Sequence, residues 1–244
     1  MELSLRHVHE LDFEWLAGEL EKYGLRVSAF ATGRMYLEGK LCLCDLRPSV
    51  RAKIQEELIA VMKLASRFQA PVIIGGVRGR LTGDFSHREK QREAAIHALR
   101  RLAMIAKDLG IYLVLEPINR YETNFINCTA EGIELIQNVG HPALKLLLDT
   151  FHMNIEEADP LSAIRKASKQ LGYIHFADNN RLAPGQGHID FPAVVKVLTE
   201  IGYSGFITAE VLPKPDDATA LLQTGRYLHT LTRSATYGKM ENPS

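Results

Sequence analysis

Apolar residues along the chain follow two alternating patterns, short apolar runs and longer stretches with helical spacing. The runs are rich in Val, Ile and Leu, which is typical of strands buried on both faces of a parallel sheet. They cover residues 2–5, 27–30, 71–77, 112–115, 144–149, 173–177 and 205–211. A period near 3.6 predicts a helix at residues 49–69, and further helices, several of them bounded by capping residues and glycines, are expected at residues 12–23, 93–108, 129–139, 160–170, 191–201 and 218–232.

Strict alternation of strands and helices predicts an α/β fold with a parallel sheet. With 244 residues, the chain fits one (β/α)8 TIM barrel, a fold that commonly takes about 200–250 residues. We therefore expect a single TIM-barrel domain over residues 1–244. No G-x-G-x-x-G follows an early strand, which weakens the alternative of a dinucleotide-binding sheet. Only seven of the eight strands expected for this barrel can be counted in the sequence. Either the first βα unit is missing from this chain or one strand is not recognisable from its sequence.

Charge and composition exclude several classes of function. The 29 basic residues balance 29 acidic ones, so the chain has no excess of positive charge with which to bind nucleic acid. No apolar run approaches the roughly 20 residues that cross a bilayer. The start of the sequence lacks the layout of a signal peptide, and the three cysteines lack the spacing of a disulfide framework. We expect a cytoplasmic protein with reduced thiols.

Acidic or imidazole side chains lie at or near the ends of four successive predicted strands. These residues are Glu116, Asp149, His175 and Glu210, and their spacings are 33, 26 and 35 residues, each about one strand plus one helix. In a parallel barrel the carboxyl ends of the strands meet at one face, so we expect these side chains to converge. A buried carboxylate is costly unless it is paired or bound to a metal.

Three carboxylates and one imidazole form an oxygen-rich set of ligands. Such a set favours Mn²⁺, Mg²⁺ or Co²⁺ over structural zinc, which prefers cysteine and histidine. We expect one divalent metal ion as cofactor, with Mn²⁺ as the first choice.

Five motifs in order carry a resemblance to a known family. They are E-P-I-N-R-Y-E (116–122), D-T-F-H-M-N-I-E-E (149–157), H-F-A-D-N-N-R (175–181), P-G-Q-G-H-I-D-F (184–191) and T-A-E (208–210). The chain resembles the xylose isomerase-like TIM-barrel family of sugar isomerases and epimerases, and within it the ketose 3-epimerases. T-G-R-M-Y and I-I-G-G-V-R-G-R also resemble the 5-keto-L-gluconate epimerase branch. The family's barrel starts one βα unit earlier than this sequence does.

The resemblance implies roles for individual residues. Glu116, Asp149, His175 and Glu210 match the ligands of one divalent ion, which acts as a Lewis acid on a ketose. Glu116 and Glu210 match the two bases that remove a proton beside the carbonyl and return it through an enediolate. The matching substrate-binding residues are Glu122, His152 and Arg181.

Two further features allow more than one interpretation. Arg78 and Arg80 follow a Gly-Gly at a strand end, where they either bind an anionic end of the substrate or pair with acids on the barrel rim. Barrel phosphate sites often lie after the last strands, so the glycines of P-G-Q-G (184–187) leave a sugar phosphate open as substrate.

Together these features predict a metal-dependent epimerase of a ketose or keto-sugar acid. Its expected partner is a small sugar molecule, with neither nucleic acid nor membrane, and the family resemblance implies a homo-oligomer. The main alternative is an aldose–ketose isomerase similar to hydroxypyruvate isomerase. A phosphodiesterase similar to AP endonucleases and a degenerate binding module are further alternatives.

Overall fold

The computed structural model describes residues 1–5, 7–8 and 11–240. Contacts divide the chain into two compact units, Met1–Leu147 and the residues from Leu148 onward. The expectation of one domain over residues 1–244 stays a prediction. Among the described residues, none of the helices combines the length and the apolar character that crossing a membrane requires.

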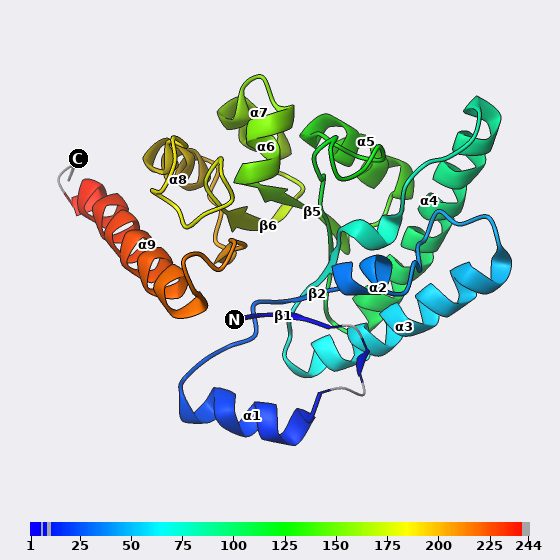
Figure 1. The fold of residues 1–244 in the computed structure, drawn as a ribbon, viewed down its shortest axis with the longest axis horizontal. Helices are drawn as coiled ribbons and strands as arrows, with labels where there is room; N and C mark the ends of the chain where they lie inside the picture. The colour runs from blue at the N-terminus through cyan, green and yellow to red at the C-terminus, as the bar shows by residue number, and fades with distance from the viewer. Residues whose placement is uncertain (6, 9–10, 241–244) are drawn as a thin grey trace. The chain divides into compact units, whose positions relative to one another are not determined.

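Parallel strands organise the first unit (Figure 1). They are β1 (Glu2–Ser4), β2 (Ala29–Ala31), β3 (Val72–Ile74), β4 (Leu113–Leu115) and β5 (Leu144–Asp149), the last of which continues past the end of the unit. Each strand pairs with the next one along the chain, as strands joined by crossover helices do. All residues of β3 and β4 are buried, which explains their continuous apolar sequence.

Helices separate these strands along the chain. They are α1 (Phe13–Lys22), α2 (Gly33–Leu37), α3 (Pro48–Arg67), α4 (Phe85–Asp108) and α5 (Thr129–Val139), with a 3₁₀ turn η2 (Gly76–Arg78) after β3. The face of α3 that repeats at helical spacing, including Ile54, Leu58 and Val61, is buried. This helix contacts β2, β3 and α4, so its apolar face covers the strands (Figure 1).

Two helix starts differ from the predicted ones. The helix expected from Ser49 begins at Pro48, because proline fits the first helical position, where its missing N–H is not needed. The helix expected from residue 93 begins at Phe85. There Asp84 accepts a hydrogen bond from the backbone N–H of His87 and caps the helix.

The second unit continues the alternation. Its elements are α6 (Thr150–Glu156), α7 (Pro160–Ala167), β6 (Leu171–Phe176), α8 (Phe191–Glu200), β7 (Ile207–Ala209) and α9 (Asp217–Met240). Strands β6 and β7 are parallel, with His175 opposite Thr208. Helix α8 contacts both α7 and α9 (Figure 1). With these two strands, the described residues contain seven strands, as the sequence predicts.

Candidate functional site

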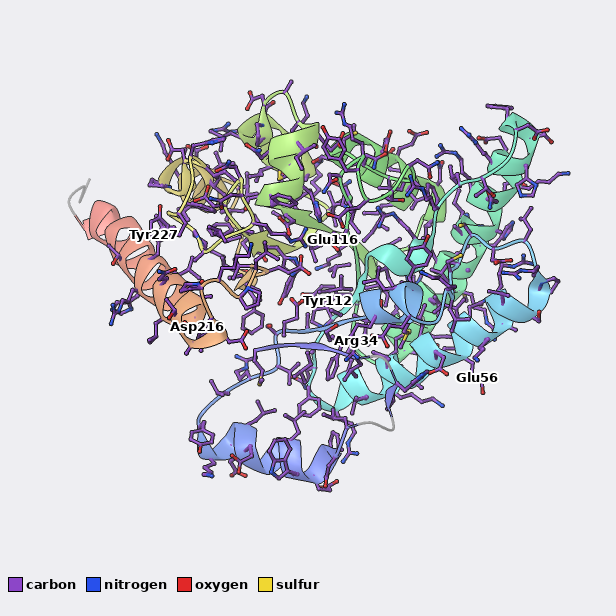
Figure 2. The ribbon with its side chains drawn as sticks, viewed as in Figure 1. Arg34, Glu56, Tyr112, Glu116, Asp216 and Tyr227 are labelled. Atoms are coloured by element: carbon purple, nitrogen blue, oxygen red, sulfur yellow. The ribbon has the colours of Figure 1, made fainter. Side chains whose placement is uncertain are left out.

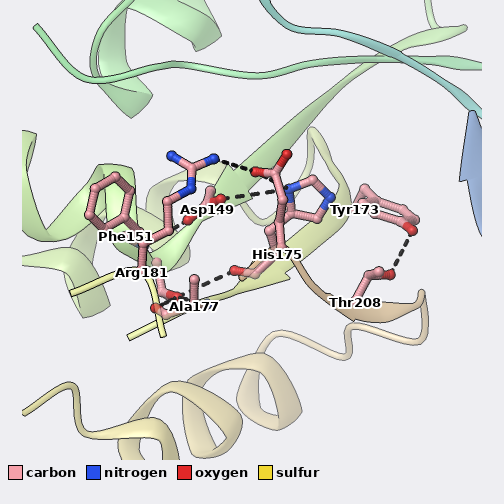
Figure 3. Close-up of polar contacts among 9 residues, drawn as sticks. Asp149, Phe151, Tyr173, His175, Ala177, Arg181 and Thr208 are labelled. Carbon is pink, nitrogen blue, oxygen red and sulfur yellow. Dashed lines mark hydrogen bonds and ion pairs between the residues drawn. The ribbon is translucent and has the colours of Figure 1, made fainter. Parts of the chain in front are cut away.

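Three candidate ligand side chains, those of Asp149, His175 and Glu210, converge in the second unit, and Figure 3 labels the first two. The Nδ1 atom of His175 lies 3.6 Å from Oδ2 of Asp149 and 3.7 Å from Oε2 of Glu210. One ligand atom from each of the three residues lies within 4.8 Å of the others. Asp149 and His175 are buried, whereas the side chain of Glu210 is 42% exposed. Solvent therefore reaches this cluster at Glu210.

The ends of three strands position the cluster. Asp149 is the last residue of β5 and also caps α6, because its Oδ1 accepts the backbone N–H of Phe151 at 2.7 Å. The other oxygen, Oδ2, is the one near His175. His175 lies one residue before the end of β6, and Glu210 follows β7 directly.

Tyr173 and Thr208 form a hydrogen-bonded pair on β6 and β7, the strands that position His175 and Glu210. The hydroxyl groups of Tyr173 and Thr208 lie 2.6 Å apart, and the Tyr173 ring stands edge-on to the His175 imidazole at 5.5 Å (Figure 3). Each member lies two residues before a cluster residue, and residues two apart on a strand share one face. Tyr173 and Thr208 are not among the residues predicted from the sequence, although each lies two residues before a candidate ligand, which is a spacing that could have identified them.

The surroundings of Asp149 keep its carboxylate charged. Burial by itself raises the pKa of a carboxyl group, but the proximity of His175, His152 and Arg181 holds the pKa of Asp149 below its usual range. Asp149 is therefore ionised at neutral pH and suited to binding a cation.

Arg181 forms an ion pair with Glu210. Its Nη2 lies 2.8 Å from Glu210 Oε2, and its guanidinium lies 4.9 Å from the centre of the Phe151 ring (Figure 3). The turn that carries Arg181 places this residue at φ 59°, a left-handed conformation that costs energy for a side chain other than glycine. The fold thus holds Arg181 beside the cluster despite local strain.

His152 also lies in the second unit, on α6. Its side chain is buried, and its ring lies 5.3 Å from that of Phe151, which in turn lies under Arg181. Two of the residues predicted to bind substrate, His152 and Arg181, therefore share Phe151 as a neighbour.

The glycine-rich loop is held by Asp178, which is fully buried. Its carboxylate accepts hydrogen bonds from the backbone N–H groups of Gly185, Gly187, Ile189 and Asn179. A Cβ atom on Gly187 would collide with the side chains of Asp178 and Asn179, so this position requires glycine. The glycine N–H groups considered for a substrate phosphate are thus already used within the protein.

In the first unit, Glu116 follows β4 directly and is labelled in Figure 2. Glu116 is buried, and its backbone N–H donates to Ile74 O on β3. A Cβ atom on Gly75 would lie 2.7 Å from Glu116 Oε2. Gly75 therefore leaves the space that the Glu116 carboxylate occupies.

Glu122 lies in the turn after β4 and is exposed. Its Oε1 accepts a hydrogen bond of 3.0 Å from Asn119 Nδ2, and its backbone N–H donates to Asn119 O. This turn presents the carboxylate to solvent.

Arg78 has a structural environment that differs from the predicted contact with substrate. Its guanidinium is completely buried and donates to the carbonyl oxygens of Phe125, Gly75 and Ile126 at 2.6–2.9 Å. Burial lowers the pKa of Arg78 to about 10, so the side chain stays protonated at neutral pH. Arg78 thus joins the turn after β3 to the segment before α5, and neither of the two predicted interpretations describes it.

Replacing Arg78 by methionine is expected to lower the free energy of unfolding by about 3 kcal/mol, because three buried carbonyl groups lose their donor. Urea denaturation followed by circular dichroism measures this change. The matched control is Arg80→Met, since Arg80 is exposed and makes one long hydrogen bond of 3.4 Å to Glu122 O. Equal destabilisation by the two substitutions would contradict the structural role of Arg78.

The cluster in the second unit fits a divalent metal ion. Ligand atoms about 2.1 Å from an octahedral ion lie about 3 Å apart when adjacent and about 4.2 Å apart when opposite. The separations of 3.6 and 3.7 Å around His175 Nδ1 fall between these values. Two carboxylates with one imidazole also match the preference of Mn²⁺ and related ions for oxygen and nitrogen ligands.

Comparison with known proteins identifies the fold. Residues 3–228 match the family model described as "Xylose isomerase-like TIM barrel". A solved structure of L-ribulose 3-epimerase superimposes with a TM-score of 0.86 at 28% identity, covering 98% of this chain and 86% of that one. The predicted TIM-barrel fold is therefore confirmed.

Two sequence relatives are named as sugar epimerases. The L-ribulose 3-epimerase of Mesorhizobium japonicum is 34% identical over 212 residues, which are 86% of this chain and 70% of that protein. The D-psicose 3-epimerase of Enterocloster bolteae is 37% identical over 142 residues, which are 57% of this chain and 47% of that protein. The second match thus spans about half the length of the relative.

Proposed function

Because the chain belongs to the xylose isomerase-like TIM-barrel family, we propose that it is a divalent-metal-dependent epimerase of a ketose or keto-sugar acid. The observation that carries this proposal is the convergence of Asp149, His175 and Glu210 at strand ends. Relatives named as 3-epimerases of L-ribulose and D-psicose support a ketose as substrate.

The proposed metal ligands are Asp149, His175 and Glu210, with Glu116 as the fourth. Glu116 follows β4, which pairs with β5, and Asp149 is the last residue of β5. The two carboxylates therefore follow neighbouring parallel strands. When bound, a divalent ion such as Mn²⁺ supplies Lewis-acid polarisation of the substrate carbonyl.

Glu116 and Glu210 are the residues that we propose to move the proton. Epimerisation removes the proton from the carbon beside the carbonyl on one face and returns a proton on the other, so it requires two acid–base groups. One carboxylate accepts the C–H proton and becomes a carboxylic acid. The other carboxyl group donates its own proton to the opposite face, which inverts the carbon, and the two residues have then exchanged protonation states.

The remaining residues bind and orient the sugar in this proposal. Arg181 has five N–H donors, so it can keep its bond to Glu210 and also donate to a sugar oxygen. His152 donates a hydrogen bond to the enediolate oxygen, and the exposed carboxylate of Glu122 accepts one from a sugar hydroxyl.

Solvent exchange tests the proposed reaction. The Mn²⁺-loaded protein is incubated in D₂O with L-ribulose, D-psicose, keto-sugar acids and ketose phosphates, and the products are followed by NMR. We expect deuterium at the carbon beside the carbonyl together with the appearance of the epimer. The same protein without added metal is the control.

Two other outcomes would replace the proposal. Deuterium at the terminal carbon with an aldose product would make the protein an aldose–ketose isomerase. Absence of both exchange and stoichiometric Mn²⁺ binding would favour a degenerate binding module.

A further inference from the structure

Two thiols lie side by side in the first unit, within the segment between α2 and α3. We propose that Cys42 and Cys44 are a peroxide-reactive pair that oxidises to an intramolecular disulfide. This inference is independent of the proposed epimerase activity, because it concerns only the segment around these two residues and its own chemistry.

The backbone holds the two sulfur atoms close to each other. The Sγ atoms of Cys42 and Cys44 are 3.9 Å apart. The backbone N–H groups of Leu43 and Cys44 donate to the carbonyl oxygens of Val77 and Arg78, which fixes this segment against the turn after β3. Cα atoms two residues apart are at most about 7 Å from each other, and a disulfide usually spans Cα separations of about 4.4–6.8 Å, so a chain that is not fully extended can form the bond.

Gly79 provides the space for the pair. A Cβ atom on Gly79 would collide with Cys44 Sγ and would lie 3.0 Å from Cys42 Sγ. Gly79 also has φ 97°, a conformation that favours glycine, so both its backbone and its surroundings require a residue without a side chain. The fold therefore packs both thiols over a single glycine.

The two thiols differ in character. The hydrogen-bonding contact between the two sulfur atoms lowers the pKa of Cys42, while the same contact together with burial raises the pKa of Cys44, whose thiol also donates to Arg80 O at 3.6 Å. Cys42 is 9% exposed and Cys44 is 1% exposed. Cys42 is thus the thiol suited to attack an oxidant, and Cys44 is the neighbour suited to resolve the product.

The oxidation is balanced with hydrogen peroxide as the oxidant. The Cys42 thiolate attacks one peroxide oxygen, the O–O bond breaks, and Cys42 becomes a sulfenic acid while hydroxide leaves. Cys44 sulfur then attacks Cys42 sulfur, the S–S bond forms, and the sulfenic oxygen leaves as water after taking up a proton. Two thiols are oxidised and one peroxide is reduced to two waters.

Mass spectrometry of the full-length protein tests the pair directly. Trypsin cleaves after Lys40 and Arg51 but not between Arg47 and Pro48, so both cysteines lie in one peptide, L-C-L-C-D-L-R-P-S-V-R (41–51). After treatment with hydrogen peroxide and alkylation of the remaining thiols, we expect this peptide to have lost two hydrogen atoms and to carry no alkyl group. Addition of dithiothreitol before alkylation should restore two alkyl groups.

Substitutions separate the two steps. In Cys44→Ser, a sulfenic acid on Cys42 should persist and react with dimedone, whereas in Cys42→Ser the residue Cys44 should not label. Cys128, a partly exposed cysteine in the described chain, is the control and should stay outside any disulfide. Retention of both thiols in peptide 41–51 under conditions that oxidise Cys128, or a disulfide that includes Cys128, would overturn the proposal.

Discussion

Replacing Glu210 by glutamine is expected to lower the rate of deuterium incorporation into the substrate by about 10³–10⁴-fold, which corresponds to a barrier higher by roughly 4–5.5 kcal/mol. Glutamine has nearly the same size and still offers an oxygen to Arg181, so the ion pair becomes a hydrogen bond from the charged arginine to a neutral amide oxygen. It cannot accept the C–H proton, however. Because Glu210 is also a proposed metal ligand, the exchange rate is measured by NMR at saturating substrate and saturating Mn²⁺, with bound Mn²⁺ quantified, so that it reports the proton transfer that we propose for Glu210.

The control for Glu210→Gln is the same substitution in another arginine–glutamate pair. Glu200 lies at the end of α8 and pairs with Arg165 at 3.0 Å, with both side chains largely exposed. Glu200→Gln should leave the exchange rate unchanged, because exposed ion pairs contribute little to stability. An exchange rate of Glu210→Gln within tenfold of the unsubstituted protein would contradict the role of Glu210 as a base.

Replacing Asp149 by asparagine is expected to weaken Mn²⁺ binding by at least about 10³-fold, which corresponds to roughly 4 kcal/mol. The substitution removes one negative charge and one strong oxygen ligand from the buried cluster. Substitution of residues that merely orient ligands already costs about 10–100-fold in metal affinity, and Asp149 is proposed as a direct ligand. Isothermal titration calorimetry with Mn²⁺ measures the change.

The chain offers a matched control for Asp149→Asn. Asp149 and Asp190 both accept a backbone hydrogen bond at the start of a helix, α6 and α8 respectively, and asparagine can accept the same bond. Asp190→Asn should therefore bind Mn²⁺ as the unsubstituted protein does. Equal Mn²⁺ affinity of the Asp149→Asn and unsubstituted proteins, with both folded by circular dichroism, would remove Asp149 from the ligand set.

The sequence predicted elements better than their boundaries. All seven strands overlap the predicted apolar runs. This agreement is expected, because a strand buried on both faces of a parallel sheet consists mostly of consecutive apolar residues. The first turns of α4 were missed because their residues are mostly exposed and polar, which removes the helical period. The helices α2 and α6 were missed because five and seven residues are too few to show one.

Polar side chains with long-range partners were harder to predict. Arg78 and Arg80 lie two residues apart and have the same chemistry, yet Arg78 is completely buried and Arg80 is exposed. The difference in burial arises because the guanidinium of Arg78 donates hydrogen bonds to the carbonyl oxygens of Phe125 and Ile126, which are more than 40 residues away in the sequence. The loop with Gly185 and Gly187 leaves a phosphate site open in the sequence, but the backbone N–H groups of both glycines donate to the carboxylate of Asp178. No local sequence pattern indicates that Asp178 accepts these hydrogen bonds.

The alternation of strands and helices and the presence of acids and histidine at strand ends can be predicted from the amino-acid sequence, because both depend on local spacing along the chain. The pairing of Arg181 with Glu210, the contact between Tyr173 and Thr208, and the packing of two thiols over Gly79 become evident only in the folded chain. This difference arises from the range of each interaction. Burial follows a periodic pattern that a single segment carries, whereas a hydrogen bond or ion pair requires two particular atoms within about 3 Å, and packing between remote segments sets that distance.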